Sequence, residues 1–379
     1  MSTVIKAILA NTSNALEMRE LTLDEPQANE VLVKILGVGL CHTDLSVRDG
    51  NLPAPLPMVL GHEGAGVVEK VGPGVTVVQP GDRVVLSFDS CGQCPPCQKG
   101  RPAICNKILD LNFGGARREE GNLGLCDHDH GKQEIHGSFF GQSSFGTYAL
   151  ASERSIVKIE DEEAPLELLG PLGCGIQTGA GAVINSLEVE PGSHVAIFGA
   201  GSVGLSAVMA AKVCGAATII AIDTQPNRLE LARELGATHT FNPEEEDDIL
   251  DAIKQSNGGR GLAYTVETTG VPEVLEQCIK LLDHGGACAV VGAPPQGSTA
   301  SFDINELLTG KRIVGVTEGD AIPQLFIPKL IALHQQGRFP FDKLIKTYDL
   351  ADIDAAVEDS ESGDVLKPVL IPSGEDIAS

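Results

Sequence analysis

The sequence predicts an α/β protein in which a β-rich part precedes a parallel sheet covered by helices. Strand-like segments rich in proline and glycine dominate the first part, whereas short aliphatic runs alternate with helical stretches after Gly175. Aromatic residues make up only 4% of the chain and tryptophan is absent, so Val, Ile, Leu and Ala must fill the core. Strands buried between two helical layers have this aliphatic composition.

Length and charge narrow the class of protein further. The 379 residues suit two or three domains, at about 150 residues for each. Asp and Glu total 52 against 27 Lys and Arg, which gives a formal net charge of −25. Because nucleic acids and anionic membranes bind basic surfaces, we expect neither as a partner. No signal-peptide pattern is evident in the first residues, and we expect a cytoplasmic protein.

The longest apolar stretch, residues 204–222, has the length of a membrane span. Lys212 lies in its middle, however, and Cys214-Gly215 interrupts it. We therefore predict a helix followed by a buried strand.

Four of the ten cysteines are clustered with the spacing C-x2-C-x2-C-x7-C in a segment rich in glycine and proline. They are Cys91, Cys94, Cys97 and Cys105. In a reducing compartment such a cluster indicates a metal rather than disulfides. Four thiolates complete the tetrahedral shell of Zn(II), which predicts a structural zinc site. An iron–sulfur cluster is the alternative, although the C-x3-C-P ending of ferredoxin motifs is missing.

A glycine-rich turn follows the aliphatic run 195–198 and opens a helix predicted to end near Lys212. The next strand, residues 218–222, ends on Asp223, so an acid lies about 20 residues beyond the glycines. This G-x-G-x-x-G pattern predicts a Rossmann fold, in which the turn and the helix N-terminus receive a dinucleotide pyrophosphate. The glycines of the motif are Gly199, Gly201 and Gly204.

Asp223 suits the 2′-hydroxyl of the adenosine ribose and would repel a 2′-phosphate, so NAD is favoured over NADP. Arg228 is either a contact of the adenosine end or an exposed helix charge. The carboxyl ends of the later strands, 263–266 and 287–291, should border the same crevice.

Cys41, His62 and Cys174 are far apart in the sequence and each has an ordinary interpretation as a buried thiol or a core histidine. Together they supply two thiolates and one imidazole beside the dinucleotide motif. Such a set leaves a fourth position open on a catalytic zinc, as in alcohol dehydrogenases.

The chain resembles zinc-dependent alcohol dehydrogenases of the medium-chain dehydrogenase/reductase superfamily over nearly its whole length. The segment GHEGAGVVEKVGPGV fits the family's pattern G-H-E-x2-G-x5-G-x2-V, and GPLGCGIQTG and IFGAGSVG resemble the third-ligand segment and the cofactor turn. The stretches VGLCHTDLSVRDG and 318–348 look most like the aryl-alcohol (benzyl alcohol) branch. The resemblance implies a GroES-like catalytic domain with a structural zinc lobe over residues 1–176, a Rossmann NAD-binding domain over 177–319, and a return to the catalytic domain over 320–379.

This resemblance also implies the activity, which is reversible oxidation of a primary aromatic or allylic alcohol to the aldehyde with NAD and two Zn(II) per chain. Cys41, His62 and Cys174 would hold the catalytic zinc, which lowers the pKa of the alcohol so that hydride passes from an alkoxide to the nicotinamide. Asp44 is expected to orient His62, and Glu63 to lie behind the ligands or to replace one transiently.

Two other activities stay open, a general alcohol dehydrogenase and an S-(hydroxymethyl)glutathione dehydrogenase. The latter needs a basic residue for the carboxylate of the adduct, and Arg117 and Arg118 are the candidates. Beside Glu119 and Glu120 they are more simply part of a solvated loop. The glycine-rich segment 111–144 that contains them has no other predicted role.

Further roles follow from the resemblance. Thr43 is our choice to receive the alcohol proton, because a hydroxyl both donates and accepts. Where several relatives end this relay with a histidine the chain has Ser46, and the neighbouring His42, a pyrophosphate contact in the family, is an alternative base. Lys367 is a second candidate for the pyrophosphate. The predicted contacts of the nicotinamide end are Val203, Thr178 and Val291.

Phe88, Phe139 and Phe140 are either the aromatic walls of a substrate pocket or core residues. Glu318 falls near the substrate channel of relatives without an evident role. The family implies a homodimer or homotetramer, and we expect the interface at the edge strand around residues 301–316.

Overall fold

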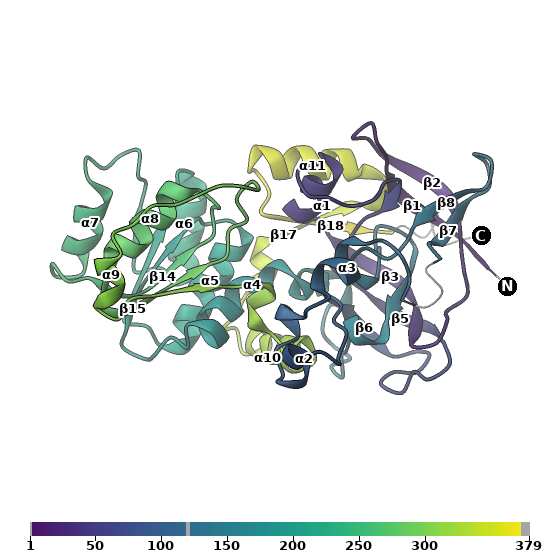
Figure 1. Cartoon of the computed structure of the whole chain (residues 1–379), viewed down its shortest axis with the longest axis horizontal. Coiled ribbons are helices and arrows are strands. Elements are labelled where there is room, and N and C mark those ends of the chain that lie inside the picture. The colour runs from purple at the N-terminus through teal and green to yellow at the C-terminus, as the bar shows by residue number, and fades with distance from the viewer. Residues whose placement is uncertain (1, 119–121, 373–379) are drawn as a thin grey trace. The chain divides into compact units, whose positions relative to one another are not determined.

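The computed structural model describes residues 2–118 and 122–372, and the chain divides into two compact units. The first unit comprises Met1–Cys174, Ile322–Ile331 and Asp342–Ser379, and the second comprises Gly175–Ala321 and Ala332–Phe341. Figure 1 labels the elements of both units along the chain.

The first unit is rich in β-structure and contains a small closed barrel and a larger sheet. The barrel has the strand order β1-β2-β7-β8-β4. Its strands are β1 (Thr3–Ala10), β2 (Leu16–Leu23), β4 (Met58–Val59), β7 (Gly124–Asp127) and β8 (Gln133–His136). Closure pairs the edge strands with each other, so the barrel has no open edge.

The larger sheet has seven strands in the order β10-β6-β5-β3-β18-β17, with β9 also paired to β3. Its strands are β3 (Glu30–Gly39), β5 (Gly64–Val71), β6 (Arg83–Leu86), β9 (Tyr148–Ser152), β10 (Ile156–Lys158), β17 (Ile345–Asp349) and β18 (Lys367–Ile371). The last strand, β18, pairs antiparallel with the end of β3, and Figure 1 shows it in the yellow of the chain's end beside earlier strands. The last strand of the described chain therefore completes a sheet that begins with β3.

Short helices connect the strands of the first unit. They are α1 (His42–Arg48), α2 (Pro95–Gln98), α3 (Ile108–Phe113) and α11 (Ile353–Ser362), while α10 (Pro323–Gln335) runs from the first unit into the second. Buried aliphatic side chains from β1 and β3 contribute strongly to the core, as the composition predicts.

The second unit is a six-stranded sheet with the order β13-β12-β11-β14-β15-β16, and all of its pairings are parallel. The strands are β11 (His194–Phe198), β12 (Thr218–Ile222), β13 (His239–Phe241), β14 (Leu262–Glu267), β15 (Leu282–Val290) and β16 (Arg312–Gly315). The strand order reverses beside β11, and ligands of such sheets bind beyond the carboxyl ends at this point. The predicted α/β fold class, with its Rossmann sheet, is confirmed.

Helices connect the parallel strands of the second unit. They are α4 (Gly175–Gly181), α5 (Ser202–Cys214), α6 (Pro226–Leu235), α7 (Ile249–Ser256), α8 (Pro272–Leu281) and α9 (Asn305–Leu308). The apolar stretch 204–222 falls on α5 and β12, as predicted, and Gly215 ends the helix with φ +79°. Within the described residues, no helix is long and apolar enough to cross a membrane.

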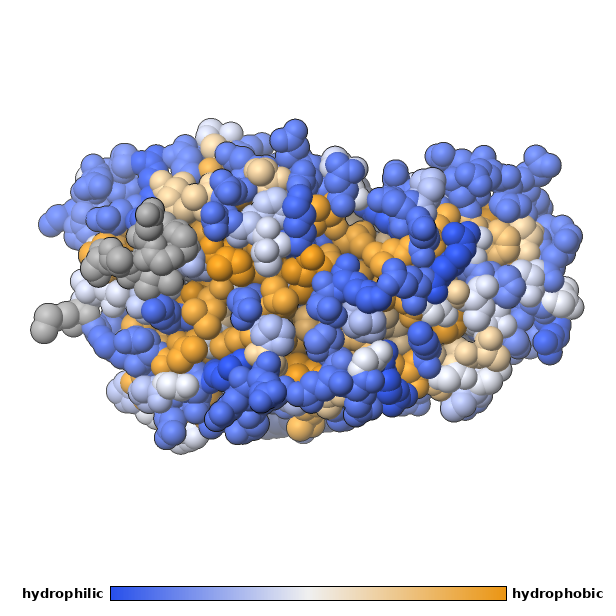
Figure 2. Space-filling model, turned by 180° about the vertical axis from the view of Figure 1, so that it is seen from behind, coloured by the Kyte–Doolittle hydropathy of each residue, from blue (hydrophilic) through white to orange (hydrophobic). Residues whose placement is uncertain are grey.

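The outermost strand of the second unit, β16, lies next to exposed apolar side chains. Ile304 is 72% exposed, Leu308 80% and Ile313 37%. Elsewhere, hydrophilic residues cover much of the face in Figure 2, although hydrophobic residues are also exposed on it.

Candidate metal and cofactor sites

Cys41, His62, Glu63 and Cys174 lie together in the first unit, with one potential ligand atom of each within 4.8 Å of the others. Cys41 follows β3 and is the N-cap of α1, whereas His62 and Glu63 lie in the connection from β4 to β5. Cys174 follows the turn Gly170–Gly173. A Cβ atom on Gly173 would lie 2.0 Å from the Leu86 carbonyl oxygen, so glycine is needed to bring this turn against β6.

Asp44 connects the separate parts of this cluster. Its Oδ2 accepts the Cys41 backbone N–H at 3.0 Å, and its Oδ1 accepts the Gly61 backbone N–H at 3.0 Å. Oδ1 also lies 3.0 Å from Nδ1 of His62. One buried carboxylate thus positions two of the potential ligands.

His62 is fully buried, and its Nε2 has no hydrogen-bond partner of normal geometry in the part of the chain that the structure describes. Because Asp44 accepts from Nδ1, that nitrogen carries the proton of the neutral ring, and Nε2 then keeps a lone pair. Burial opposes the charged ring, but Asp44 and Cys41 raise the pKa of His62 well above its usual value, so a metal that binds Nε2 would displace a proton from it. A buried lone pair without a donor is what a metal ligand requires.

The pKa of the Cys41 thiol is lowered, which favours the thiolate that binds a metal. Its hydrogen bond with Cys174 lowers the pKa of Cys41 well below the usual value, against burial and with help from the charge of Lys367. Two sulfurs and one imidazole nitrogen match the donor set of catalytic zinc, with room for a fourth ligand. The residues therefore fit zinc.

Glu63 is paired with Lys367 of β18, and both side chains are buried. The Lys367 ammonium donates to the two Glu63 carboxylate oxygens at 3.0 and 3.1 Å and to the Leu40 carbonyl at 3.2 Å. Burial raises the pKa of Glu63 to about 7, against the effect of Lys367. The prediction that Lys367 binds pyrophosphate is wrong, because its ammonium is buried and its three donors already have acceptors.

Aromatic rings surround His62. Phe140 stacks on the imidazole at a centroid distance of 4.4 Å, and Phe139 meets it edge-on at 5.5 Å. Phe113, which the sequence did not single out, packs against both phenylalanines at 5.7 and 5.2 Å. Phe88 is buried in the same core. The three predicted phenylalanines are thus buried, and two of them contact the potential ligand His62; their place in a substrate pocket stays a prediction.

The first turn of α1 carries the remaining predicted residues of this site. Thr43 is half-buried, with its Oγ1 3.7 Å from the Cys41 sulfur. His42 is exposed and Ser46 is half-buried. The hydroxyl of Thr43 thus contacts the sulfur of a potential metal ligand, as a relay residue would.

The four clustered cysteines converge as their spacing predicts. One sulfur each of Cys91, Cys94, Cys97 and Cys105 lies within 4.8 Å of the others. Backbone N–H groups point at these sulfurs, among them Cys94 N to Cys91 Sγ at 3.3 Å and Cys91 N to Cys105 Sγ at 3.3 Å. The N–H groups of Gln93 and Cys94 lower the pKa of Cys91 to about 6. Backbone N–H groups also lower the pKa of Cys94, whereas burial raises the pKa of Cys105 and raises that of Cys97 to about 12, so zinc would displace protons from these two thiols. Four converging sulfurs fit a structural zinc.

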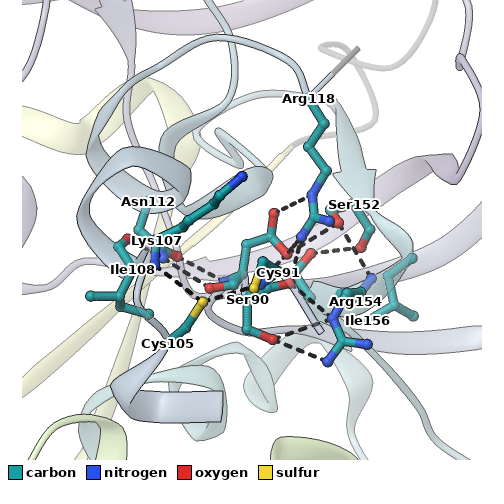
Figure 3. A network of polar contacts seen from close by, with 12 residues as sticks. Ser90, Cys91, Cys105, Lys107, Ile108, Asn112, Arg118, Ser152, Arg154 and Ile156 are labelled. Atoms are coloured by element: carbon teal, nitrogen blue, oxygen red, sulfur yellow. Dashed lines mark hydrogen bonds and ion pairs between the residues drawn. The ribbon is translucent and has the colours of Figure 1, made fainter. Parts of the chain in front are cut away.

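Two arginines anchor the segment that follows β6 and leads into this cysteine lobe (Figure 3). Arg118 donates to Asp89 at 2.8 Å and to the Ser90 carbonyl at 2.7 Å. Arg154 donates to the same carbonyl at 2.8 Å. Asn112 adds a hydrogen bond to the Asp89 carbonyl at 3.0 Å.

The interpretation of Arg117 and Arg118 as part of a solvated loop is wrong. The side chain of Arg117 is only 2% exposed and forms ion pairs with Glu30 and Asp24. Arg118 is partly exposed but pairs with the buried Asp89. Arg117 is thus not accessible to the carboxylate of a glutathione adduct. Their neighbours Glu119 and Glu120 lie outside the described residues.

The glycine-rich turn of the second unit joins β11 to α5. Gly199 has φ +92°, and a Cβ atom on Gly204 would lie 1.8 Å from the Gly199 carbonyl oxygen. Gly201 is the N-cap of α5, and a Cβ atom there would meet nothing within 4 Å. The backbone is thus tightly turned and open above Gly201, which fits the approach of a pyrophosphate.

Asp223 lies at the end of β12 against this turn. Its Oδ2 accepts the Ala200 backbone N–H at 2.6 Å and its Oδ1 accepts the Gln225 N–H at 2.9 Å. Arg228, on α6, places a guanidinium nitrogen 3.9 Å from the Asp223 carboxylate. The arginine therefore lies beside the acid predicted to meet the ribose.

The other predicted cofactor residues also lie in the second unit. Thr178 is on α4 and Val203 opens α5, and both are half-buried. Val291 follows β15 and donates its N–H to the Glu267 carbonyl at 2.9 Å. Glu318 has φ +50° and accepts a hydrogen bond from Gln177 of α4 at 3.1 Å, a contact that the sequence did not indicate.

Comparison with protein families gives two matches. Residues 27–161 match the family described as "Alcohol dehydrogenase GroES-like domain". Residues 202–335 match the family described as "Zinc-binding dehydrogenase".

Similar proteins match over almost the whole chain. A curated geraniol dehydrogenase from Castellaniella defragrans is 48% identical over 96% of both chains. An alcohol dehydrogenase zinc-binding domain protein from Burkholderia ambifaria has a solved structure with a TM-score of 0.95 and 52% identity, covering 98% of this chain and 100% of its own. The structure of benzyl alcohol dehydrogenase from Acinetobacter calcoaceticus gives a TM-score of 0.93 and 50% identity with the same coverage.

Proposed function

The chain belongs to the zinc-dependent alcohol dehydrogenases of the medium-chain dehydrogenase/reductase superfamily, and from that premise we propose that it oxidises primary aromatic or allylic alcohols reversibly with NAD. The observation that carries the proposal is the donor set of Cys41, Cys174 and the buried Nε2 of His62. We further propose two zinc ions per chain, one in this cluster and one in the cysteine lobe.

A zinc ion in the Cys41 cluster would act as a Lewis acid and lower the pKa of the substrate hydroxyl beside it. Asp44 holds the Nδ1 proton of His62, so that Nε2 keeps the lone pair that a metal needs. In our proposal the Oγ1 of Thr43 receives the proton of the alcohol, since it lies on the same turn as Cys41 and can pass on a proton of its own.

Aromatic and allylic alcohols are the proposed substrates for two reasons. Phe139 and Phe140 contact His62, and ring contacts with a flat, unsaturated substrate add about 0.5–1.5 kcal/mol to the burial of its surface. Two similar proteins carry the names geraniol dehydrogenase and benzyl alcohol dehydrogenase, and the substrates in those names are allylic and benzylic alcohols.

NAD is the proposed cofactor because Asp223 presents a carboxylate next to the glycine-rich turn. The open backbone above Gly201 and the N-terminus of α5 would receive the pyrophosphate. NAD supplies the hydride acceptor, and the protein supplies its binding and orientation. We also propose a homodimer or homotetramer, with the interface at β16.

The test is reduced-cofactor formation at 340 nm with geraniol, benzyl alcohol and ethanol, each with NAD and NADP. We expect the highest kcat/KM for geraniol or benzyl alcohol with NAD. Cys174→Ser should abolish turnover and lose one zinc equivalent, whereas Cys126→Ser, a half-buried cysteine of the same unit outside both clusters, should retain both. Equal kcat/KM values for ethanol and benzyl alcohol would contradict the substrate class, and full activity of Cys174→Ser would contradict the site.

A further inference from the structure

A polar groove lies at the amino ends of the parallel strands of the second unit, at the opposite end of the strands from the glycine-rich turn. Two cavities of about 270 and 380 Å³ form it, and both are lined by Gly261, Asp283 and His284. His194, the first residue of β11, and Arg312, the first residue of β16, also line the smaller cavity. We call this surface the amino-end groove.

Four cationic side chains of the groove have no ion pair and no side-chain hydrogen bond to the residues that the structure describes. Arg260 and Arg312 line the smaller cavity, and Lys254 and Lys280 line the larger one. This gathering of unpaired positive charge is unexpected in a chain with a net charge of −25.

The acidic residues of the groove already have partners. Glu306 pairs with the buried Lys311. One carboxylate oxygen of Asp303 accepts from the backbone and side chain of Asn305, and one of Asp283 accepts the N–H of the next residue. Asp283 and Asp303 keep their negative charges, because their donors are neutral; five cations nevertheless line the groove against three carboxylates, which leaves a net positive charge.

We propose that the amino-end groove binds a small polyanion of the oligophosphate class. Arginine forks bind phosphate oxygens through paired, charge-assisted hydrogen bonds, and lysines add point charges. The larger cavity, of about 380 Å³, falls within the range of small-molecule sites, about 300–1,000 Å³, and the smaller one, of about 270 Å³, lies just below it. In this proposal Arg260 and Arg312 bind one end of the anion in the smaller cavity. Lys254 and Lys280 bind the part of the anion that extends into the larger cavity.

The test is titration of the full-length protein with inorganic pyrophosphate by calorimetry at low ionic strength, with zinc content measured before and after. We expect saturable binding that weakens between about 20 and about 200 mM NaCl, because salt screens exposed charges. Arg260→Gln and Arg312→Gln should each raise Kd about tenfold, the loss of one charge-assisted contact. Both variants should keep the wild-type rate of alcohol oxidation without pyrophosphate, which shows that they fold.

The matched control is Arg233→Gln, which removes an exposed arginine of α6 outside the groove and should change Kd less than twofold. The proposal is overturned if pyrophosphate does not bind, or if Arg260→Gln and Arg312→Gln bind it as the control does, since the anion then lies elsewhere, for example at the glycine-rich turn. Because Arg312 opens β16, where we also propose the subunit interface, light scattering must show that both groove variants keep the wild-type mass. A changed mass would assign these arginines to the subunit contact and would also overturn the proposal.

Discussion

Nδ1 of His62 lies 3.0 Å from Oδ1 of Asp44, and both side chains are excluded from solvent. The same carboxylate accepts the backbone N–H groups of Cys41 and Gly61. Asp44 thus fixes the ring proton of one potential zinc ligand and the backbone of another. The role of Asp44 is accessible to experiment because asparagine has nearly the same shape without the charge.

Asp44→Asn should lower the zinc affinity of the Cys41 cluster by about 10- to 100-fold, since partners of ligating histidines have effects of this size. The amide still accepts one hydrogen bond, but it no longer favours a protonated Nδ1. Competition with a chelator would measure the affinity. Asp49→Asn, at the exposed end of α1, is the control and should behave as wild type; unchanged affinity in Asp44→Asn would contradict the role.

Lys367→Met should destabilise the first unit by about 3–5 kcal/mol, because it leaves Glu63 buried without its partner. The double variant Glu63→Gln with Lys367→Met should recover part of that loss. Urea unfolding of the single and double variants gives the free energy of unfolding. A Lys367→Met protein as stable as wild type would show that Glu63 is neutral or solvated.

Zinc release from the cysteine lobe should depend on pH. Backbone N–H groups lower the pKa of Cys91 to about 6 without metal, and bound zinc lowers it further. Because the pKa of the Cys91 thiol is lower in the folded lobe than its usual value, ionisation of this thiol stabilises the folded lobe at high pH. This stabilisation is lost as the pH falls through the pKa of the folded state. Zinc release should therefore increase as the pH falls, because protons compete with zinc for the four sulfurs, and a colorimetric chelator would measure it. Release that does not change with pH would contradict this assignment.

Asp223→Ser should shift cofactor preference from NAD toward NADP by removing the charge that repels a 2′-phosphate. Arg228, 3.9 Å from this carboxylate, would then be free to meet the phosphate. Asp223→Ser with Arg228→Gln should accordingly lose most of the gain. The ratio of kcat/KM for the two cofactors measures both effects. If the double variant keeps the NADP activity of the single one, Arg228 has no part in it.

Polar substitution of the exposed apolar residues beside β16 should dissociate the proposed oligomer. Ile304 and Leu308 are 72% and 80% exposed, and replacing both by serine removes apolar surface at the sheet edge. Light scattering should report a smaller assembly than the wild type. Leu325→Ser changes a residue 59% exposed on α10 and should leave the mass unchanged. The interface lies elsewhere if the double variant keeps the wild-type mass.

Local patterns predicted the parts of the site that lie close in sequence. The spacing from Cys91 to Cys105 is short enough for loop geometry alone to bring the sulfurs together. The alternation of strands and helices likewise predicted the parallel sheet, because its pairings follow from the βαβ pattern.

Local sequence patterns did not predict contacts between residues that are far apart in the sequence. Glu63 and Lys367 are 304 residues apart. Nothing in the sequence around a single lysine in an aliphatic strand indicates which acidic residue it pairs with. Arg117 looked solvated because its sequence neighbours are charged, whereas its ion pair with Glu30 spans 87 residues. Only the resemblance to a family brought Cys41, His62 and Cys174 together before the structure was known.

The pairing of β18 with β3 sets an order of events during synthesis. The Lys367 ammonium reaches the Leu40 carbonyl across 327 residues, so this contact must wait until almost the whole chain has left the ribosome. Until then Glu63 lacks its ion pair with Lys367, and the larger sheet lacks β18, which joins β17 to β3. A nascent chain that stalls before residue 367 therefore exposes an unpaired strand edge, the kind of surface that chaperones bind. The contacts of Lys367 with Leu40 and Glu63 can therefore form only after β18 has been synthesised.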